Sequence, residues 1–273
     1  MALPVVKWLG GKRQLLHAIK ERLPLKYGKY FEPFFGGGAL FFDLCPKNAV
    51  INELNDQLVN VYVQIKNNPQ QVIYYLEIYQ SIYNSGTTDD ERTESYYGAR
   101  DDFNSLISEH IYSAESAAIL IFLNKAGFNG LYRVNSEGHY NVPSAHRKSL
   151  KAFDENNIFE VSKALQSCII KQGDFEDGCK YVKKGDFVFF DSPYFDTFDT
   201  YQADGFTEKD HKRLARLFNK LSNRGVFCML TNSNSEYIKD LYKNYKIEII
   251  DVKRSINSDG SNRTGSEVII RNY

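Results

Sequence analysis

A short polar segment, Asp191-Ser192-Pro193-Tyr194, directly follows the apolar run Phe187–Phe190. The run is short and rich in aromatic residues, which predicts a buried strand. Asp191 then lies at the carboxyl end of that strand, where open α/β sheets bind their ligands. A carboxylate and a main-chain carbonyl both accept hydrogen bonds from an amine, and a tyrosine ring offers a face for stacking. The segment is therefore predicted to hold a flat ligand that carries an amine.

Three consecutive glycines, Gly36 to Gly38, stand between an expected strand at 29–35 and an expected helix. Glycine lets the backbone approach a ligand where a Cβ would collide, and a helix start adds N–H donors. The spacing is not that of the dinucleotide-binding pattern G-x-G-x-x-G. A plain tight turn explains these glycines equally well.

Two further acids follow expected strands. Glu53 ends a strand within 48–55, about 15 residues after the glycines, where an acid can bind both ribose hydroxyls. A helix cap or a solvated charge is the alternative for Glu53. Asp174 lies in a Gly-Asp-Phe turn, which could offer a carboxylate to an adenine amine and the Phe175 ring for stacking. A simple strand-to-helix turn is the alternative there.

These residues need a sheet to position them. Further strands are expected within 167–175, 186–194, 225–233, 247–254 and 266–273, and helices at 207–223 and 234–245. Strands that alternate with helices predict an α/β fold with a parallel sheet. Hydrophobic residues make up 42% of the 273 and charged residues 25%, which is typical of a globular protein.

A mainly helical block interrupts the alternation between about residues 56 and 165. Helices are expected at 56–68, 69–84 and 113–126. The stretch 87–109 is polar, and its first part, 87–95, is expected to be a loop or the start of a helix. Residues 127–148 mix glycine, asparagine, aromatic and basic residues, which predicts a hairpin with loops. We therefore predict one domain from 1–55 and 166–273, with 56–165 inserted into it.

The overall composition says more about the cellular compartment of the protein than about its binding partner. The 34 basic and 34 acidic residues cancel, but nucleic-acid binding needs only a local basic face. The four cysteines have neither C-x-x-C nor zinc spacing, which favours free thiols in a reducing compartment, and no metal site is expected. No apolar run reaches the length of a membrane span, and the N-terminus has no signal-peptide pattern. A cytoplasmic protein without membrane contact is predicted.

The order of these motifs resembles that of the Dam-type DNA N6-adenine methyltransferases. The matching segments are K-W-L-G-G-K at 7–12, F-E-P-F-F-G-G-G-A at 31–39, Glu53, the inserted block, G-D-F at 173–175 and D-S-P-Y at 191–194. The similarity extends from Lys7 to the C-terminus. It implies a Rossmann-like, S-adenosylmethionine-dependent methyltransferase sheet with an inserted, mainly helical DNA-recognition domain that carries a β-hairpin.

The resemblance also implies roles for individual residues. The catalytic turn is implied to be Asp191, Ser192, Pro193 and Tyr194. Cofactor binding is implied for Trp8, Lys12, Phe35, Gly36, Gly38, Glu53, Asp174, Phe175 and Asp191. DNA contact is implied for Asn129, Leu131, Arg133, Asn141, Pro143 and Arg147. Arg133 is the strongest candidate for a guanine, because arginine pairs bidentately with its major-groove edge.

The implied reaction is methyl transfer from S-adenosylmethionine to the N6 amine of an adenine flipped out of double-stranded DNA, within GATC and without a metal. We expect a monomer, and two settings stay open: protection of DNA beside a restriction endonuclease, or independent action.

The family pattern at the turn is D-P-P-Y, so Ser192 is a departure. Only the main chain of residue 192 is needed as an acceptor, so activity is expected to survive, although the stiffness of a second proline is lost. The alternatives are a catalytically weakened DNA-binding protein and a methyltransferase for RNA adenine or protein glutamine. Aspartate rather than asparagine at 191, together with the hairpin, favours a DNA base.

Two predictions concern residues outside these motifs. His17, His110 and His211 are expected to be surface residues on helices. The Gly-, Ser- and Asn-rich segment 253–265 is expected to be a loop, from which Lys253, Arg254 and Arg263 could contact the DNA backbone.

Overall fold

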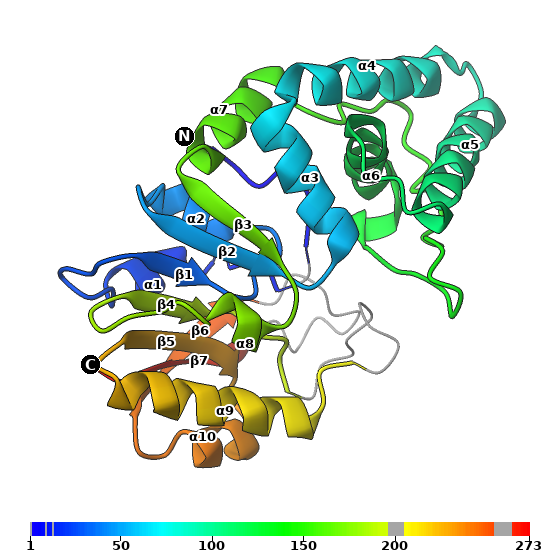
Figure 1. The fold of residues 1–273 in the computed structure, drawn as a ribbon. Helices are drawn as coiled ribbons and strands as arrows, with labels where there is room; N and C mark the ends of the chain where they lie inside the picture. Colours follow the sequence, from blue (N-terminus) through cyan, green and yellow to red (C-terminus); the bar gives the residue numbers. More distant parts are fainter. Residues whose placement is uncertain (1, 9, 13, 196–204, 254–263) are drawn as a thin grey trace. The chain divides into compact units, whose positions relative to one another are not determined.

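The computed structural model describes residues 2–8, 10–12, 14–195, 205–253 and 264–273. Its seven-stranded sheet has the order β3-β2-β1-β4-β5-β7-β6, which confirms the predicted α/β class (Figure 1). The strands are β1 Tyr30–Glu32, β2 Ala49–Glu53, β3 Cys168–Gln172, β4 Phe187–Phe190, β5 Phe227–Ser233, β6 Lys246–Lys253 and β7 Thr264–Arg271.

The helices differ widely in length. They are α1 Leu16–Lys20, α2 Ala39–Leu44, α3 Asp56–Asn67, α4 Pro69–Ser85, α5 Asp89–Ser108, α6 Ala114–Ala126, the 3-10 turn η1 Phe128–Gly130, α7 Glu155–Leu165, α8 Phe175–Gly178, α9 Glu208–Asn223 and α10 Glu236–Leu241. In the part of the chain that the structure describes, none of the helices combines the length and apolar character needed to span a membrane.

The chain folds as two compact units. The helical unit comprises residues 1–11, 36–45 and 53–172, and the sheet unit comprises 12–35, 46–52 and 173–273. The division of the chain into 1–55 with 166–273 and an inserted 56–165 stays a prediction.

The sheet unit contains a reversal of strand order that matters for ligand binding. Strands β1, β2, β4 and β5 are parallel, and the chain passes from β1 to β2 on one side before it returns to β4 and β5 on the other. Ligands of open α/β sheets bind outside the carboxyl ends of the strands at such a switch point, which here lies between β1 and β4.

The last strand pair differs from the parallel sheet that the sequence predicts. β7 is antiparallel to both β5 and β6. Residues 254–263 separate β6 from β7, fewer than the dozen or so that a parallel crossover needs. The short connection therefore favours antiparallel pairing of β6 with β7.

Helix α9 covers the sheet in its own unit (Figure 1). Its buried face carries Leu214, Phe218 and Leu221, which pack in one apolar cluster with residues of β4 and β5. His211 lies on the same face and is only 2% exposed, so the prediction of a surface position for it is wrong. Its ring packs edge-on against Phe195 and Phe206.

The helical unit is built around α6, which contacts α3, α4 and α5 (Figure 1). Eleven of its thirteen residues are buried, as expected for a helix surrounded by others. Ser113 caps its start by accepting a hydrogen bond from the Ser116 N–H. The polar stretch after α4 is the start of α5, where Thr88 and Glu91 form a capping box.

Candidate active site

The D-S-P-Y turn lies beside the end of a neighbouring strand. Phe190, the last residue of β4, pairs in parallel with Leu230 of β5. Beyond the end of β4 the chain stays beside β5, so Asp191 and Ser192 form hydrogen bonds with Thr231 and Asn232. The parallel register therefore decides which side chains surround the turn.

Asp191 is held by a cation and a hydroxyl. Lys12 Nζ lies 2.6 Å from Asp191 Oδ1, and the Lys12 side chain is only 5% exposed. Thr231 Oγ1 donates to the same oxygen at 2.9 Å. Burial raises the pKa of Asp191, whereas Lys12 and the hydrogen bond from Thr231 lower it. Lys12 thus favours the ionised carboxylate in a desolvated position.

Tyr194 has a fixed ring and a neutral hydroxyl. Its hydroxyl donates to the Glu267 carboxylate on β7, and Lys12 Nζ lies 4.5 Å from the ring centroid. Burial, followed by the charges of Asp191 and Glu267, raises the pKa of Tyr194 well above its usual value. The Tyr194 side chain is therefore a ring of fixed orientation with a protonated hydroxyl.

The glycine turn is needed for close packing within the helical unit. Gly36 has a φ of +47°, and a Cβ built there would lie 2.8 Å from Trp8 Cδ1. Its N–H donates to Glu53 Oε2 at 2.8 Å, and its carbonyl accepts from the Tyr62 hydroxyl at 2.7 Å. Gly38, with a φ of +65°, precedes α2. The two positive φ values explain why glycine occupies these positions.

Glu53 is bound by main-chain donors on both oxygens. Oε2 accepts from Gly36 and Oε1 from the Asn55 N–H at 2.9 Å. Burial raises the pKa of Glu53, and the two N–H groups lower it. The cap of α3 is Asn55, whose side chain accepts from the Leu58 N–H. Glu53 is thus a half-buried carboxylate next to the glycine turn, not the helix cap.

Asn52 connects two turns of the sheet unit and was not identified from the sequence. Its side chain is buried, and Nδ2 donates to the carbonyls of Pro33 at 3.2 Å and Gly173 at 2.8 Å. The main-chain carbonyl of Asn52 accepts from the N–H of Phe35, a buried residue, at 2.9 Å. The chain before the glycines and the Gly-Asp-Phe turn are therefore positioned by one residue.

Asp174 begins α8 and forms an ion pair. Its Oδ1 accepts from the Glu176 N–H at 2.9 Å and from Arg213 at 2.8 Å. The Phe175 ring is buried, stacks on Phe34 with centroids 5.1 Å apart, and has the Arg213 guanidinium 4.8 Å from its centroid. Arg213 is thus a charged neighbour of both residues.

Comparison with known proteins identifies the family. The family model described as D12 class N6 adenine-specific DNA methyltransferase matches residues 8–256. The chain belongs to this family. It is 41% identical to the type II methyltransferase M1.LlaDCHI of Lactococcus lactis subsp. cremoris, with 99% of this chain and 95% of the relative covered.

Two other relatives show how far the similarity extends. The type II methyltransferase M.MjaIII of Methanocaldococcus jannaschii is 40% identical, with 99% of each chain covered. The DNA adenine methylase of Escherichia coli strain K12 is 26% identical, with 98% of this chain and 94% of the relative covered. The protein is thus an adenine-specific DNA methyltransferase, and its family implies S-adenosylmethionine as methyl donor.

In the methyltransferase, the segment predicted to be a hairpin, residues 127–148, turns back on itself and is joined by isolated β-bridges rather than by strands. Antiparallel bridges join Val134 with Tyr140 and Gly127 with Ser144. The exposed Arg133 forms two hydrogen bonds with Asn141. Its Nε donates to the side-chain oxygen Oδ1 at 2.7 Å, and its Nη2 donates to the main-chain carbonyl at 3.0 Å. The Arg133 fork is therefore held by Asn141 across the hairpin.

The other hairpin residues differ in exposure. Asn129 is exposed and has a φ of +54°, a conformation that asparagine tolerates better than most residues. Pro143 is exposed and Leu131 is half-buried. These positions are compatible with the DNA contacts that the sequence predicts for them, which stay predictions.

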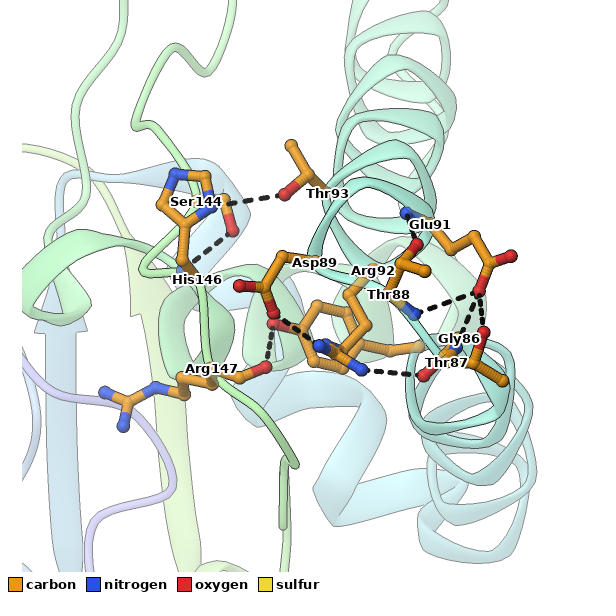
Figure 2. Close-up of polar contacts among 11 residues, drawn as sticks. Gly86, Thr87, Thr88, Asp89, Glu91, Arg92, Thr93, Ser144, His146 and Arg147 are labelled. Carbon is orange, nitrogen blue, oxygen red and sulfur yellow. Dashed lines mark hydrogen bonds and ion pairs between the residues drawn. The ribbon is translucent and has the colours of Figure 1, made fainter.

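The segment that follows the hairpin is anchored on α4 and α5 (Figure 2). The Tyr83 hydroxyl donates to the Arg147 carbonyl at 2.9 Å, and His146 Nδ1 lies 3.2 Å from Thr93 Oγ1. Arg147 Nε donates to the Lys125 carbonyl at 3.0 Å. The main chain of this exposed basic segment is therefore fixed. Arg254 and Arg263 lie outside the described residues.

Sequence reasoning about the methyltransferase missed Thr231, Asn232 and Glu267, which bind the D-S-P-Y turn. A signal for the first two was present, because Thr231 and Asn232 end the apolar run Phe227–Leu230. Polar residues at the carboxyl end of a parallel strand face the same edge of the sheet as Asp191. Glu267 has no such signal, since its position depends on the antiparallel pairing of β7 with β5.

Proposed function

We propose that this methyltransferase modifies the N6 amine of an adenine that has been flipped out of duplex DNA, and that its recognition site is GATC. The arrangement of the D-S-P-Y turn supports this proposal most directly. Asp191 is held through one oxygen by Lys12 and Thr231, and Tyr194 is oriented by Glu267. A planar base with an amine needs this combination of an acceptor and a fixed ring.

Base flipping follows from the position of the target atom. The N6 amine of adenine in a duplex is stacked and paired, so it cannot enter a protein pocket without leaving the helix. An extruded base loses its stacking neighbours, and the Tyr194 ring offers a replacement surface. We assign contact with the DNA that surrounds the target base to the hairpin.

The chemical step requires a better nucleophile than a free adenine amine, whose lone pair is delocalised into the ring. We assign acceptance of the two amine hydrogens to the Asp191 carboxylate and the main-chain carbonyl of Ser192. These acceptors favour a pyramidal nitrogen and offset the positive charge that develops during attack. Lys12 favours the ionised form of Asp191 for this task, because it lowers a pKa that burial raises. When bound, S-adenosylmethionine supplies a methyl group activated by a sulfonium.

The donors and acceptors of the chain fit this methyl donor. Asn52 Oδ1 is buried, and none of the described residues forms a hydrogen bond with it, although its Nδ2 is fully used. A buried acceptor of this kind requires a partner, such as an N–H or O–H of a ligand. The carboxylates of Glu53 and Asp174 add acceptors suited to ribose hydroxyls and an adenine amine.

We assign binding of the methyl donor to the residues that the family resemblance implies. These are Trp8, Lys12, Phe35, Gly36, Gly38, Glu53, Asp174, Phe175 and Asp191. Their functions differ by chemistry: the glycines allow close approach of the main chain, the acids accept hydrogen bonds, and the rings provide stacking surfaces.

Recognition of GATC is assigned to the hairpin. The planar fork of Arg133 matches the O6 and N7 acceptors of guanine, and Asn141 already restrains that fork. Asn129, Leu131, Pro143 and Arg147 complete the proposed DNA contacts. The relatives named type II methyltransferases support a role beside a restriction endonuclease.

Transfer of a labelled methyl group tests the proposal. The purified enzyme and labelled S-adenosylmethionine are incubated with matched duplexes that contain GATC or a scrambled site, and with single-stranded RNA and protein acceptors. Digestion to nucleosides should yield labelled N6-methyldeoxyadenosine, and only from the duplex that contains GATC. Label in the scrambled duplex at the same level would refute GATC, and label in RNA or protein would refute the substrate class. Asp191→Ala serves as the inactive control.

A further inference from the structure

Asn232 lies next to the one position at which the catalytic turn departs from its family pattern. It follows Thr231 near the end of β5, and its side chain is fully buried. The parallel register of β4 and β5 places it beside Ser192. Its signal in the sequence is its place just after the apolar run Phe227–Leu230.

The Asn232 amide binds Ser192 and Pro193 of the turn and Phe195, which follows it. Its Nδ2 donates to Ser192 Oγ at 3.1 Å and to the Pro193 carbonyl at 3.2 Å. Its Oδ1 accepts from the Phe195 N–H at 3.0 Å. The Ser233 N–H donates to the same oxygen at 2.8 Å, which fixes the amide on its own strand.

The orientation of this amide is unambiguous. Exchanging its oxygen and nitrogen would place an acceptor against the Pro193 carbonyl and a donor against two N–H groups. Both donors and the acceptor are used in the observed orientation, so a buried amide is fully satisfied. A second contact supports the same segment, since Ser233 Oγ donates to the Phe195 carbonyl at 3.0 Å.

The effect on the turn follows from the chemistry of residue 192. A proline there would fix its own φ through the ring, whereas serine leaves φ free to rotate. In this chain the Ser192 hydroxyl is bound to a buried amide that also binds the next carbonyl. The side chain of Ser192 is therefore tethered to β5, and its main-chain carbonyl is restrained with it.

We propose that Asn232 is a positioning residue for methyl transfer, and that its hydrogen bond to Ser192 replaces the stiffness of a proline at that position. The inference rests on the proposed function, because it concerns the carbonyl that accepts an amine hydrogen of the target adenine. Asn232 acts through Ser192 and Pro193 and does not itself touch the base. Misplacing a catalytic acceptor by about 1 Å lowers a rate by about 100-fold.

A double-mutant cycle tests the coupling between the two residues. The variants are Ser192→Ala, Ser192→Pro, Asn232→Ala and the combination of Asn232→Ala with Ser192→Pro. Ser192→Ala should lower kcat roughly threefold to tenfold, the contribution of one neutral hydrogen bond, with little change in KM for DNA. Ser192→Pro should keep kcat within about twofold of wild type, since the ring restores the constraint.

The decisive comparison is the rescue. Asn232→Ala should lower kcat by roughly 10–100-fold, and adding Ser192→Pro should recover about tenfold of that loss. A role limited to stability predicts instead that Asn232→Ala lowers the Tm, and that the effects of the two substitutions on kcat multiply without rescue. Either multiplicative effects or an unchanged kcat in Ser192→Ala would overturn the inference.

Asn234→Ala provides a matched control on the segment that follows β5. Asn234 donates to Ser266 Oγ at 2.9 Å, and within the described part of the chain its side chain forms no hydrogen bond with the D-S-P-Y turn. Its replacement should lower Tm without changing kcat or responding to Ser192→Pro.

Fluorescence of 2-aminopurine at the target position reports base placement independently, and Asn232→Ala should reduce this fluorescence. If the wild-type enzyme transfers no methyl group to DNA adenine, the proposed function fails and the inference with it, whereas wild-type activity without coupling overturns the inference alone.

Discussion

Replacing Gly36 with alanine should destabilise the protein and weaken binding of the methyl donor. The reason is geometric, because Gly36 has a φ of +47° and a Cβ there would lie 2.8 Å from Trp8 Cδ1. The left-handed conformation costs a residue with a Cβ about 1–2 kcal/mol. Forcing an extra carbon against a ring costs about 1–3 kcal/mol. The expected loss of unfolding free energy is therefore roughly 2–5 kcal/mol.

Two other glycines separate the two contributions. Gly138 has a φ of +82° and no described heavy atom within 4 Å of its added Cβ, so Gly138→Ala should cost only about 1–2 kcal/mol. Gly98 lies within α5, where an added Cβ likewise meets no described atom within 4 Å. Because alanine is the better helix former, Gly98→Ala should stabilise by up to about 1 kcal/mol.

Urea titration followed by circular dichroism measures the three unfolding free energies, and calorimetric titration measures the Kd for S-adenosylmethionine. Gly36→Ala should raise that Kd by about tenfold, equivalent to about 1.4 kcal/mol, because the Gly36 main chain binds Glu53 and Tyr62. The two control variants should leave it unchanged. Equal stability losses for Gly36→Ala and Gly138→Ala would refute the steric part of the reasoning, and an unaltered Kd would refute the role of the glycine turn in binding.

The remaining predictions concern catalysis, pH and specificity. Asp191→Asn should lower kcat by about 10²–10³-fold in the labelled-methyl assay, because a charged acceptor is lost, and a kcat within twofold would contradict its role. Activity should fall as the pH falls through the pKa of Asp191, and this acid limb of kcat/KM should lie above the usual carboxyl range because burial raises that pKa. Lys12→Gln should move the acid limb to still higher pH, because Lys12 lowers the pKa of Asp191. A shift of the limb to lower pH would contradict this prediction. Arg133→Ala should reduce discrimination at one guanine by about 1–3 kcal/mol in competition assays, and Asn141→Ala should produce a smaller loss at the same base pair rather than at another. Burial lowers the pKa of His211 from its ordinary 6.5 to about 4. As the pH falls through this interval the unfolded chain binds the proton before the folded protein does, so the unfolding free energy should fall. In urea titrations at several pH values, His211→Phe should flatten that pH dependence.

Most helices and strands could be predicted from the sequence, because their signals lie in neighbouring residues. The helix expected at 69–84 is α4, Pro69–Ser85, whose first residue is a proline suited to that position. The polar stretch 87–109 was harder, because α5 buries only Tyr96, Ala99 and Phe103 and so has a weak apolar period. Its capping box, Thr88 with Glu91, was the available signal.

Burial of individual residues was less predictable than the elements that carry them. His211 stands in the charged run that begins α9 and resembles a solvated position, yet it is enclosed by Phe195, Phe206 and Tyr237. These rings come from three other parts of the chain. A pattern within one helix does not contain that information.

The sequence by itself determined the types of group at the ends of the strands: an acid and a tyrosine after β4, glycines after β1 and an acid at the end of β2. It did so because strand ends and turns depend on neighbouring residues. Only the tertiary structure decided what binds these groups. Lys12, Asn232 and Glu267 reach the D-S-P-Y turn from distant parts of the chain, through strand register and close packing. Serine at position 192 is explained at this second level, since its partner is set by the pairing of β4 with β5.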